Sequence, residues 1–311
     1  MDRRQFTIAT AAVGGRLLLD PFSALRAAAA QNADALSPAY AESVEISGLS
    51  EDGASEFEVR LARFPPRSSG TLWATVCLGD QVYNVALDDV KLSAPGRTRV
   101  EDADARFEVS GASGTSALLE RHRDGTLIGS VRVAVSAHRS ADPPAGAGSE
   151  AVTIDAHFES AHAPVRVLPA RLEVMGRVSA TVRTPSGVVS IAGVGKWHEQ
   201  TGNRPRFATP FTYLTAASRD HGLLAVARQP APFGFAWLGG ETIKVKTVKI
   251  GAPADRRAFT VELENGRRID GETRMIRTIS TPIEGQRRPS ATIKVTSTIG
   301  DMIGHINDWT G

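Results

Sequence analysis

The chain lacks several patterns that identify common protein classes. It has one cysteine, Cys77, in the apolar stretch LWATVCLGD, so it cannot form an internal disulfide, and we expect a buried thiol. Its net charge is only +2, which leaves no basic field to attract nucleic acid. Arg16 and Asp20 interrupt the weakly apolar segment near the start, so no run approaches the roughly 18 apolar residues of a membrane span. We therefore expect no nucleic acid among its partners and no membrane span.

Motifs of the common cofactor and nucleophile chemistries are also missing. There is no G-x-S-x-G elbow, and the glycine groups lack the strand-to-helix setting of a phosphate cradle. The seven histidines show no H-x-H or HExxH spacing. His157 and His162 lie five residues apart, which places them on opposite faces of a strand. We expect no cofactor and no metal, because a metal site would need ligands from distant segments.

The first thirty residues differ from the rest. MDRRQFTIATAAVGGRLLLDPFSALRAAAA contains Arg3 and Arg4, then Phe6, and ends on small residues. Residues 1–30 resemble a twin-arginine export signal, although an amphipathic helix remains an alternative. The resemblance implies a periplasmic or secreted protein. Residues 31–41 are small and polar, and we expect a flexible leader there.

Strand patterns fill the rest of the chain. In SEFEVRLARF, the apolar Phe57, Val59 and Leu61 alternate with charged residues, which predicts a half-buried antiparallel strand. In ETIKVKTVKI the alternation changes phase near Thr247, which predicts a β-bulge. Convincing helical periodicity is absent, so we predict an all-β fold.

Turns divide these strands. Asp124-Gly125 and Asn265-Gly266 are dipeptides favoured in tight hairpins, because the turn needs positive φ. SADPPAGAGSE, residues 140–150, predicts a flexible loop. Many short antiparallel strands favour closed barrels, since closure removes exposed edges. The length suits two consecutive barrels, which we place at residues 42–195 and 196–311.

Reactive side chains gather in GKWHEQTGNRPRFATPF, residues 195–211. His198 and Glu199 are adjacent, so a regular strand points them to opposite faces, and His198 is the better candidate for a pocket. Either group could transfer protons there. The structural alternative is that His198 bonds across the domain junction and that Glu199 pairs with Arg204 or Arg206.

Aromatic and polar residues in and after this segment could bind a ligand, because two domains make a cleft where they meet. FGFAW is a candidate aromatic surface, although the alternative that its side chains form barrel core is favoured. The candidate substrate-binding residues are Trp197, Gln200, Arg204, Phe211, Tyr213, Phe235 and Trp237.

The order of these features resembles a known superfamily. From Arg171, the chain reads RLEVMGRVSATVRTPSGVVSIAGVGKWHEQTGNRPRF, and FGFAWLGGETIKVKTVKI follows. This is similar to the two-domain lipocalin-like proteins that include carotenoid 1,2-hydratase (hydroxyneurosporene synthase), kievitone hydratase and Diels–Alderases. Gly195 and Gly202 frame the segment as in that family, while His198-Glu199 stands where the family has Asp-His. The resemblance implies two lipocalin-like antiparallel barrels.

The resemblance also implies a function. It suggests a cofactor-independent lyase or hydratase that performs acid–base chemistry at carbon, with His198 and Glu199 as catalytic candidates at the domain junction. Its substrate would be a hydrophobic, isoprenoid- or polyketide-like small molecule. The alternative is a non-catalytic exported carrier of a lipid or pigment. An enzyme should have ionisable groups in its cavity, whereas the cavity of a carrier should be apolar throughout.

Overall fold

The computed structural model describes residues 37–92, 100–203, 209–283 and 285–309. The predicted export signal and residues 31–36 of the leader lie outside these ranges. Tyr40 and Ala41, which the prediction assigned to the leader, begin the first strand. Most of the described residues lie in antiparallel strands, and the one described helix is a short 3-10 turn, η1 (Pro65–Arg67), so the all-β prediction is confirmed. No described helix is long and apolar enough to cross a membrane.

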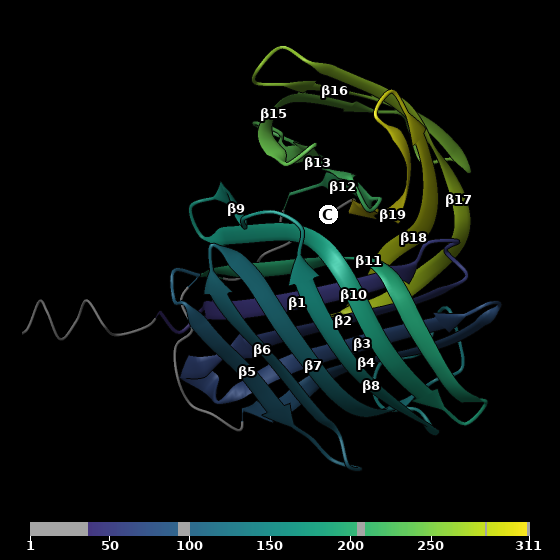
Figure 1. Cartoon of the computed structure of the whole chain (residues 1–311). Helices are drawn as coiled ribbons and strands as arrows, with labels where there is room; N and C mark the ends of the chain where they lie inside the picture. Colours follow the sequence, from purple (N-terminus) through teal and green to yellow (C-terminus); the bar gives the residue numbers. More distant parts are fainter. Residues whose placement is uncertain (1–36, 93–99, 204–208, 284, 310–311) are drawn as a thin grey trace, which may run out of the picture. The chain divides into compact units, whose positions relative to one another are not determined.

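The first barrel is a closed ring of ten strands (Figure 1). The strands of this sheet are β1 (Tyr40–Ser50), β2 (Ser55–Phe64), β3 (Ser69–Leu78), β4 (Gln81–Leu92), β5 (Asp104–Ser110), β6 (Ser116–Asp124), β7 (Thr126–Ala137), β8 (Glu150–Ser160), β9 (Val165–Leu168), β10 (Arg171–Thr184) and β11 (Gly187–Asn203). Neighbours in the chain pair in order from β1 to β8; β8 pairs with β10, and β11 closes the ring between β10 and β1. The short β9 pairs with β10 beside this ring.

The second barrel closes in simple chain order (Figure 1). Its strands are β12 (Phe211–Ala217), β13 (His221–Arg228), β14 (Phe233–Leu238), β15 (Glu241–Ile250), β16 (Arg256–Leu263), β17 (Arg268–Ile283), β18 (Gln286–Ser297) and β19 (Gly300–Trp309). β12 pairs with β19 and closes it. The prediction of two consecutive barrels is confirmed. The expected division after residue 195 falls within β11, and the change of barrel comes between β11 and β12.

Both predicted hairpins and the bulge are present. Asp124 pairs with Thr126 around Gly125, whose φ is +72°, and Gly266, with φ of +84°, lies in the turn between β16 and β17. The register of β15 shifts between Val245 and Thr247, where the sequence phase changes. Residues 140–149 form neither helix nor strand.

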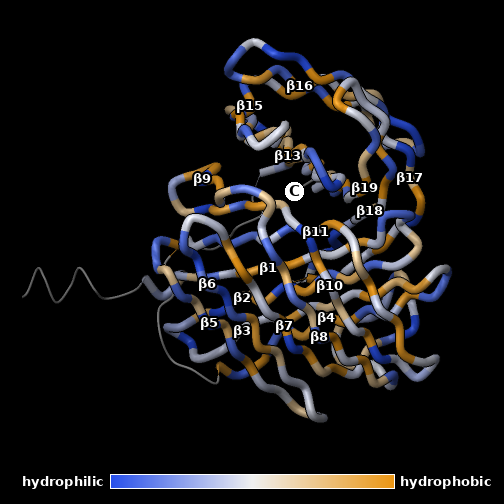
Figure 2. The backbone as a smooth tube through the Cα atoms, viewed as in Figure 1, coloured by the Kyte–Doolittle hydropathy of each residue, from blue (hydrophilic) through white to orange (hydrophobic). Residues whose placement is uncertain are grey.

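Each barrel encloses an apolar core. Large side chains such as Phe57, Leu61 and Phe158 fill the first, and Leu223, Phe259 and Ile293 are among those that fill the second. Figure 2 shows the hydrophobic and hydrophilic residues alternating along many of the strands. This alternation follows from the pleat, which turns successive side chains to opposite faces.

The outer faces of some strands are buried as well. A third apolar cluster joins Met175 and Val194 of the first barrel to Phe235, Trp237 and others of the second. β1 is buried on both faces from Tyr40 to Leu49, and the charged face of β2 is buried too. The half-buried prediction for β2 is therefore wrong, because that face contacts the second barrel.

Candidate functional site

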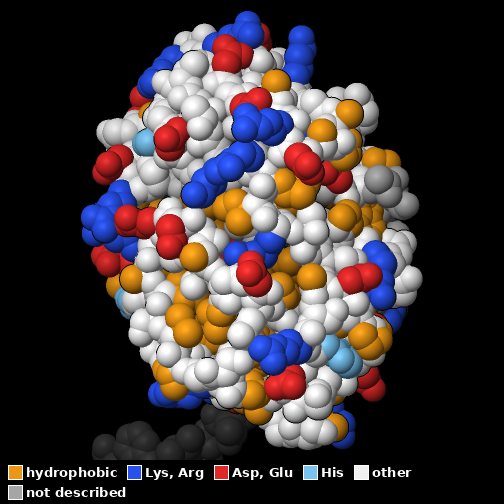
Figure 3. Space-filling view, turned by 90° about the vertical axis from the view of Figure 1, so that its right-hand side faces the viewer, with side chains coloured by type: hydrophobic (Ala, Val, Ile, Leu, Met, Phe, Trp, Pro, Cys, Tyr) orange, Lys and Arg blue, Asp and Glu red, His pale blue; other side chains and the backbone are white. Residues whose placement is uncertain are grey.

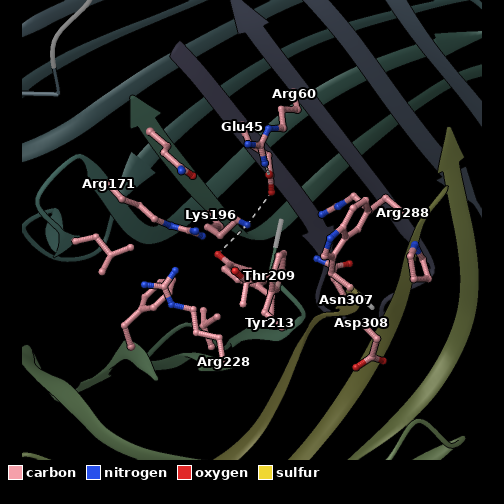
Figure 4. A pocket seen from close by; sticks show the side chains of 17 residues that line it. Glu45, Arg60, Arg171, Lys196, Thr209, Tyr213, Arg228, Arg288, Asn307 and Asp308 are labelled. Carbon is pink, nitrogen blue, oxygen red and sulfur yellow. Dashed lines mark hydrogen bonds and ion pairs between the residues drawn. The ribbon is translucent and has the colours of Figure 1, made fainter. Parts of the chain in front are cut away.

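A cavity of about 190 Å³ lies between the outer faces of the two barrels. The first barrel and its adjoining strand β9 line it from β1, β2, β9, β10 and β11, and the second barrel from β12, β13, β14, β18 and β19 (Figure 4). The lining residues are Glu45, Arg60, Leu168, Arg171, Lys196, Gln200, Thr209, Phe211, Tyr213, Val226, Arg228, Phe233, Arg288, Pro289, Asn307, Asp308 and Trp309.

Strand register places a row of ionisable side chains behind this cavity. His198 on β11 is paired with Glu45 on β1 and with Glu173 on β10, so the three residues lie side by side. Two residue pairs further along, Ser47 and Met175 flank Lys196 in the same way. Alternation turns Lys196, His198 and Gln200 to one face of β11, and this face lies toward the second barrel.

Lys196 and Tyr213 link the row to the second barrel. Lys196 Nζ donates to Glu45 Oε1 at 2.7 Å and to the Tyr213 hydroxyl at 3.1 Å (Figure 4). The Tyr213 hydroxyl in turn lies 3.2 Å from both carboxylate oxygens of Glu173. All four side chains are buried, so each charge has its partners within the protein.

Neighbouring charges set the ionisation of this network. Burial alone would raise the pKa of Glu173, but contacts with His198, Arg171 and Lys196 outweigh it and lower the pKa to about 2. Burial would also raise the pKa of Glu45. The positive charges of Lys196 and Arg60 outweigh this effect and hold the pKa well below its usual value. Burial and Glu173 raise the pKa of Tyr213. At neutral pH this network holds two carboxylates and an un-ionised phenol.

Lys196 remains an ammonium ion despite its burial. Burial favours the neutral amine, yet the nearby Glu45, Tyr213 and Glu173 together raise the pKa of Lys196 above its usual value. The charge also lies 4.6 Å from the centre of the Tyr213 ring. A fixed cation therefore lines the cavity throughout the ordinary pH range.

His198 is neutral at pH 7. Burial, helped by the charge of Arg171, lowers the pKa of His198 to about 4, although Glu173 opposes this shift. His198 Nδ1 lies 2.8 Å from Glu173 Oε1, so the neutral ring donates its proton there. Its Nε2 atom is buried and has no hydrogen-bond partner among the described residues. The imidazole thus keeps a free lone pair.

Arginines occupy much of the remaining wall. Arg60 donates to Glu45 Oε2 at 3.0 Å, and Arg171 lies 2.6 Å from Glu173 Oε1. Arg288 donates to Glu58 at 2.8 Å. These bonds position planar guanidinium groups beside the cavity, where they can bind oxygen atoms of a ligand.

Apolar side chains complete the wall. Leu168, Phe211, Val226, Phe233 and Trp309 all line the cavity. Thr209 and Arg228 are exposed, so one side of the cavity reaches solvent. On one face of the molecule, charges of both signs are interspersed with hydrophobic patches (Figure 3). The cavity therefore offers apolar contact and charge to the same ligand.

The two faces of β11 lie in different places, and only one of them faces the cavity. Trp197 and Glu199 share one face, as expected, and that face lies inside the first barrel. Glu199 accepts from Arg121 Nε at 2.6 Å and from Trp197 Nε1 at 2.8 Å. Arg121 is thus a partner of Glu199, whereas the expected partners Arg204 and Arg206 lie outside the described residues. The structure does not bring Glu199 or Trp197 to the cavity.

Some of the other candidate residues line the cavity, and others do not. Gln200, Phe211 and Tyr213 line the cavity. Phe235 and Trp237 pack between the barrels, where both contact the ring of His162. His198 bonds within the first barrel, and the expected bond across the junction comes instead from Lys196 and Tyr213. Arg204 lies outside the described residues.

Sequence reasoning missed most of the charged wall. Lys196 lies in the segment of residues 195–211, two residues before His198. Strand alternation could therefore have placed the two side chains on the same face. Glu45, Arg60 and Arg171 come from distant strands, and only the barrel closure brings them together. No group of three or more metal-ligating side chains occurs within the described ranges.

No protein-family model matches the chain, and no curated protein matches its sequence. Solved structures share its fold. The crystal structure of CghA has a TM-score of 0.60 at 11% identity over 89% of this chain and 90% of CghA. CghA with Sch210972 gives a TM-score of 0.53 at 12% identity, covering 89% of each chain. Kievitone hydratase from Nectria haematococca gives 0.50 at 9% identity, covering 86% of this chain and 88% of the hydratase. These structures confirm the expected two-barrel, lipocalin-like fold.

Proposed function

We propose that this chain is an enzyme that works without a cofactor on a small organic molecule held between its two barrels. The observation that carries the proposal is the network at the cavity wall, where Lys196 and Tyr213 bond to each other and each bonds to a buried carboxylate. A carrier of a lipid or pigment would need no such network, because burying charge costs free energy that an apolar wall avoids.

Lys196 is the group we assign to substrate oxygen. An ammonium group has three N–H donors, and two of them are directed at Glu45 and Tyr213. The third can donate to a carbonyl or hydroxyl oxygen in the cavity. A fixed positive charge in a desolvated site stabilises negative charge that develops on that oxygen in the transition state. Hydration, loss of water and ring closure next to a carbonyl all benefit from such polarisation.

His198 is the group we assign to proton transfer. Its neutral ring has an unpartnered Nε2, and Glu173 behind it would stabilise the imidazolium that forms when the ring takes up a proton. His198 does not line the cavity itself, so we propose that a water molecule links it to the substrate. Glu199 has no part in this scheme, because it is paired with Arg121 inside the first barrel.

The shared fold supports the choice of reaction. Kievitone hydratase is a hydratase by name and has the same two-barrel architecture. We therefore propose a lyase or hydratase, or a related cyclase, acting on a hydrophobic isoprenoid- or polyketide-like molecule. Export by the twin-arginine pathway, to the periplasm or beyond, remains a proposal that rests on residues 1–30.

Untargeted mass spectrometry tests the proposal. The purified chain, and separately its Lys196→Met variant, would be incubated with an organic extract of the source cells. We expect the parent, and not the variant, to convert one compound into a product that differs by one water or has unchanged mass. A compound that binds the parent and is recovered unchanged would contradict the enzyme proposal and favour the carrier.

A further inference from the structure

Among the described residues, positive charges outnumber negative charges around the junction cavity. The described residues that line the cavity, together with their direct ion-pair partners, include six bases and four acids. The bases are Arg60, Arg171, Lys196, Arg228, Arg257 and Arg288, and the acids are Glu45, Glu58, Glu173 and Asp308. His198 adds no charge at neutral pH, since burial and Arg171 lower its pKa to about 4. The described residues therefore leave two positive charges in excess.

Two features contribute to this excess. Glu45 bonds to both Arg60 and Lys196. Arg228 has no hydrogen bond or ion pair with any other described residue; its guanidinium lies 4.9 Å from the centre of the Phe233 ring. Arg171 approaches the same ring at 5.1 Å. Two guanidinium groups thus contact one phenyl ring of the cavity wall.

We infer that the cavity binds an amphipathic anion: a molecule whose apolar part packs on Phe211, Phe233 and Trp309 and whose carboxylate, enolate or similar group is held by Arg228 and Arg171. The inference rests on the proposed function, because it places the ligand in the same cavity. Charge-assisted bonds from guanidinium to an anionic oxygen are among the strongest in proteins, and they strengthen where water is excluded.

The position of Arg228 fits a role in capture. It is exposed at the open side of the cavity, whereas Arg171 is largely buried in the cavity wall. An anionic group can therefore meet Arg228 first, while the apolar part enters between the aromatic side chains. A cavity of about 150 Å³ holds a ligand the size of benzene. The volume of about 190 Å³ here suits one ring or a short chain, with the remainder of the molecule toward solvent.

A matched pair of fluorescent probes tests the inference. Anilinonaphthalene sulfonate is anionic, and N-phenylnaphthylamine has nearly the same aromatic frame without the sulfonate. We expect the parent to bind the anionic probe about tenfold more tightly than the neutral one, as a charge-assisted hydrogen bond allows. Arg228→Gln should remove most of this preference and leave the affinity for the neutral probe within about twofold.

Two further variants locate the binding. Arg183→Gln removes an exposed arginine of β10 that does not line the cavity, and it should change neither affinity. Val226→Trp fills the cavity and should weaken both probes. Equal affinities of the parent for the two probes, or unchanged binding in Val226→Trp, would overturn the inference. Turnover of a neutral substrate together with equal probe affinities would leave the enzyme proposal intact and remove this one alone.

Discussion

The hydroxyl oxygen of Tyr213 lies 3.1 Å from Nζ of Lys196, and the two residues belong to different barrels. The same hydroxyl contacts Glu173 of the first barrel, so a side chain of the second barrel completes a charge network of the first. Because the network needs side chains of both barrels, the site is assembled only when the two barrels dock.

Tyr213→Phe tests this coupling. The change removes a hydroxyl that bonds to Lys196 and Glu173 and leaves both buried charges with one partner fewer. We expect a loss of about 1–3 kcal/mol in the free energy of unfolding, with a fall in turnover of the folded protein. Denaturant unfolding and steady-state kinetics measure the two effects.

Tyr83→Phe is the matched control. The Tyr83 hydroxyl bonds to Gln81 and Ser186 within the first barrel and does not line the cavity. This variant should keep its turnover. A Tyr213→Phe variant that matches Tyr83→Phe in both measurements would show that the junction hydroxyl has no special role.

Acid should destabilise the fold in two stages. The pKa of His198 is lowered by burial to about 4 from 6.5, so the unfolded chain binds the extra proton first and stability falls as pH drops from 6.5 toward 4. The pKa values of Glu173 and Glu56 are about 2 because neighbouring polar and charged groups outweigh burial, so their stabilisation is present above 4.5 and is lost as pH falls toward 2.

His198→Asn should reduce the loss of stability between pH 6.5 and 4 and leave the loss at lower pH unchanged. Each pKa unit corresponds to about 1.4 kcal/mol, so the effect is measurable by urea unfolding at a series of pH values. The parent should lose stability between pH 6.5 and 4 more steeply than the variant. Identical slopes in this range would mean that His198 is not held neutral in the folded protein.

Glu199→Gln should behave as a structural change. Glu199 bonds to Arg121 with both oxygens, at 2.6 and 2.9 Å, and the amide would remove the carboxylate charge that this buried guanidinium contacts. We expect a loss of about 3–5 kcal/mol in stability, as for other broken buried pairs. Turnover per folded molecule should stay near that of the parent. A stable variant without activity would instead support the catalytic role expected from the sequence.

The sequence predicted the fold well because the main signals are local. Alternation follows the pleat of each strand, and glycine in a tight turn follows from positive φ, so hairpins at Gly125 and Gly266 could be located without a structure. The bulge near Thr247 is local too, since one extra residue changes the alternation.

The site was harder because its determinants are not local. The charged face of β2 has the pattern of a solvated face, yet Glu56 is only 2% exposed and bonds to Thr292 of the second barrel. Alternation separated His198 from Glu199 correctly, but it could not tell that Arg121 would satisfy Glu199. Which outer faces are buried depends on how two closed barrels dock, and this is not encoded in any one strand.

The export prediction concerns residues outside the described ranges. Arg3 and Arg4 form the pair that the twin-arginine pathway would read. Changing both to lysine keeps the charge, and the precursor should then accumulate in the cytoplasm. Cell fractionation with an antibody to the mature chain measures this. Undiminished export of the double variant would rule the pathway out.

The most direct test of the central claim compares turnover and unfolding of the parent, Lys196→Arg and Lys196→Met on the substrate found by mass spectrometry. Removing one preorganised donor typically costs about 10²–10³-fold in rate. We predict a loss of this size for Lys196→Met, a smaller loss for Lys196→Arg, which keeps the charge, and melting transitions that show both variants folded at the assay temperature. Turnover by folded Lys196→Met at the rate of the parent would contradict the assignment of the junction cavity as the active site.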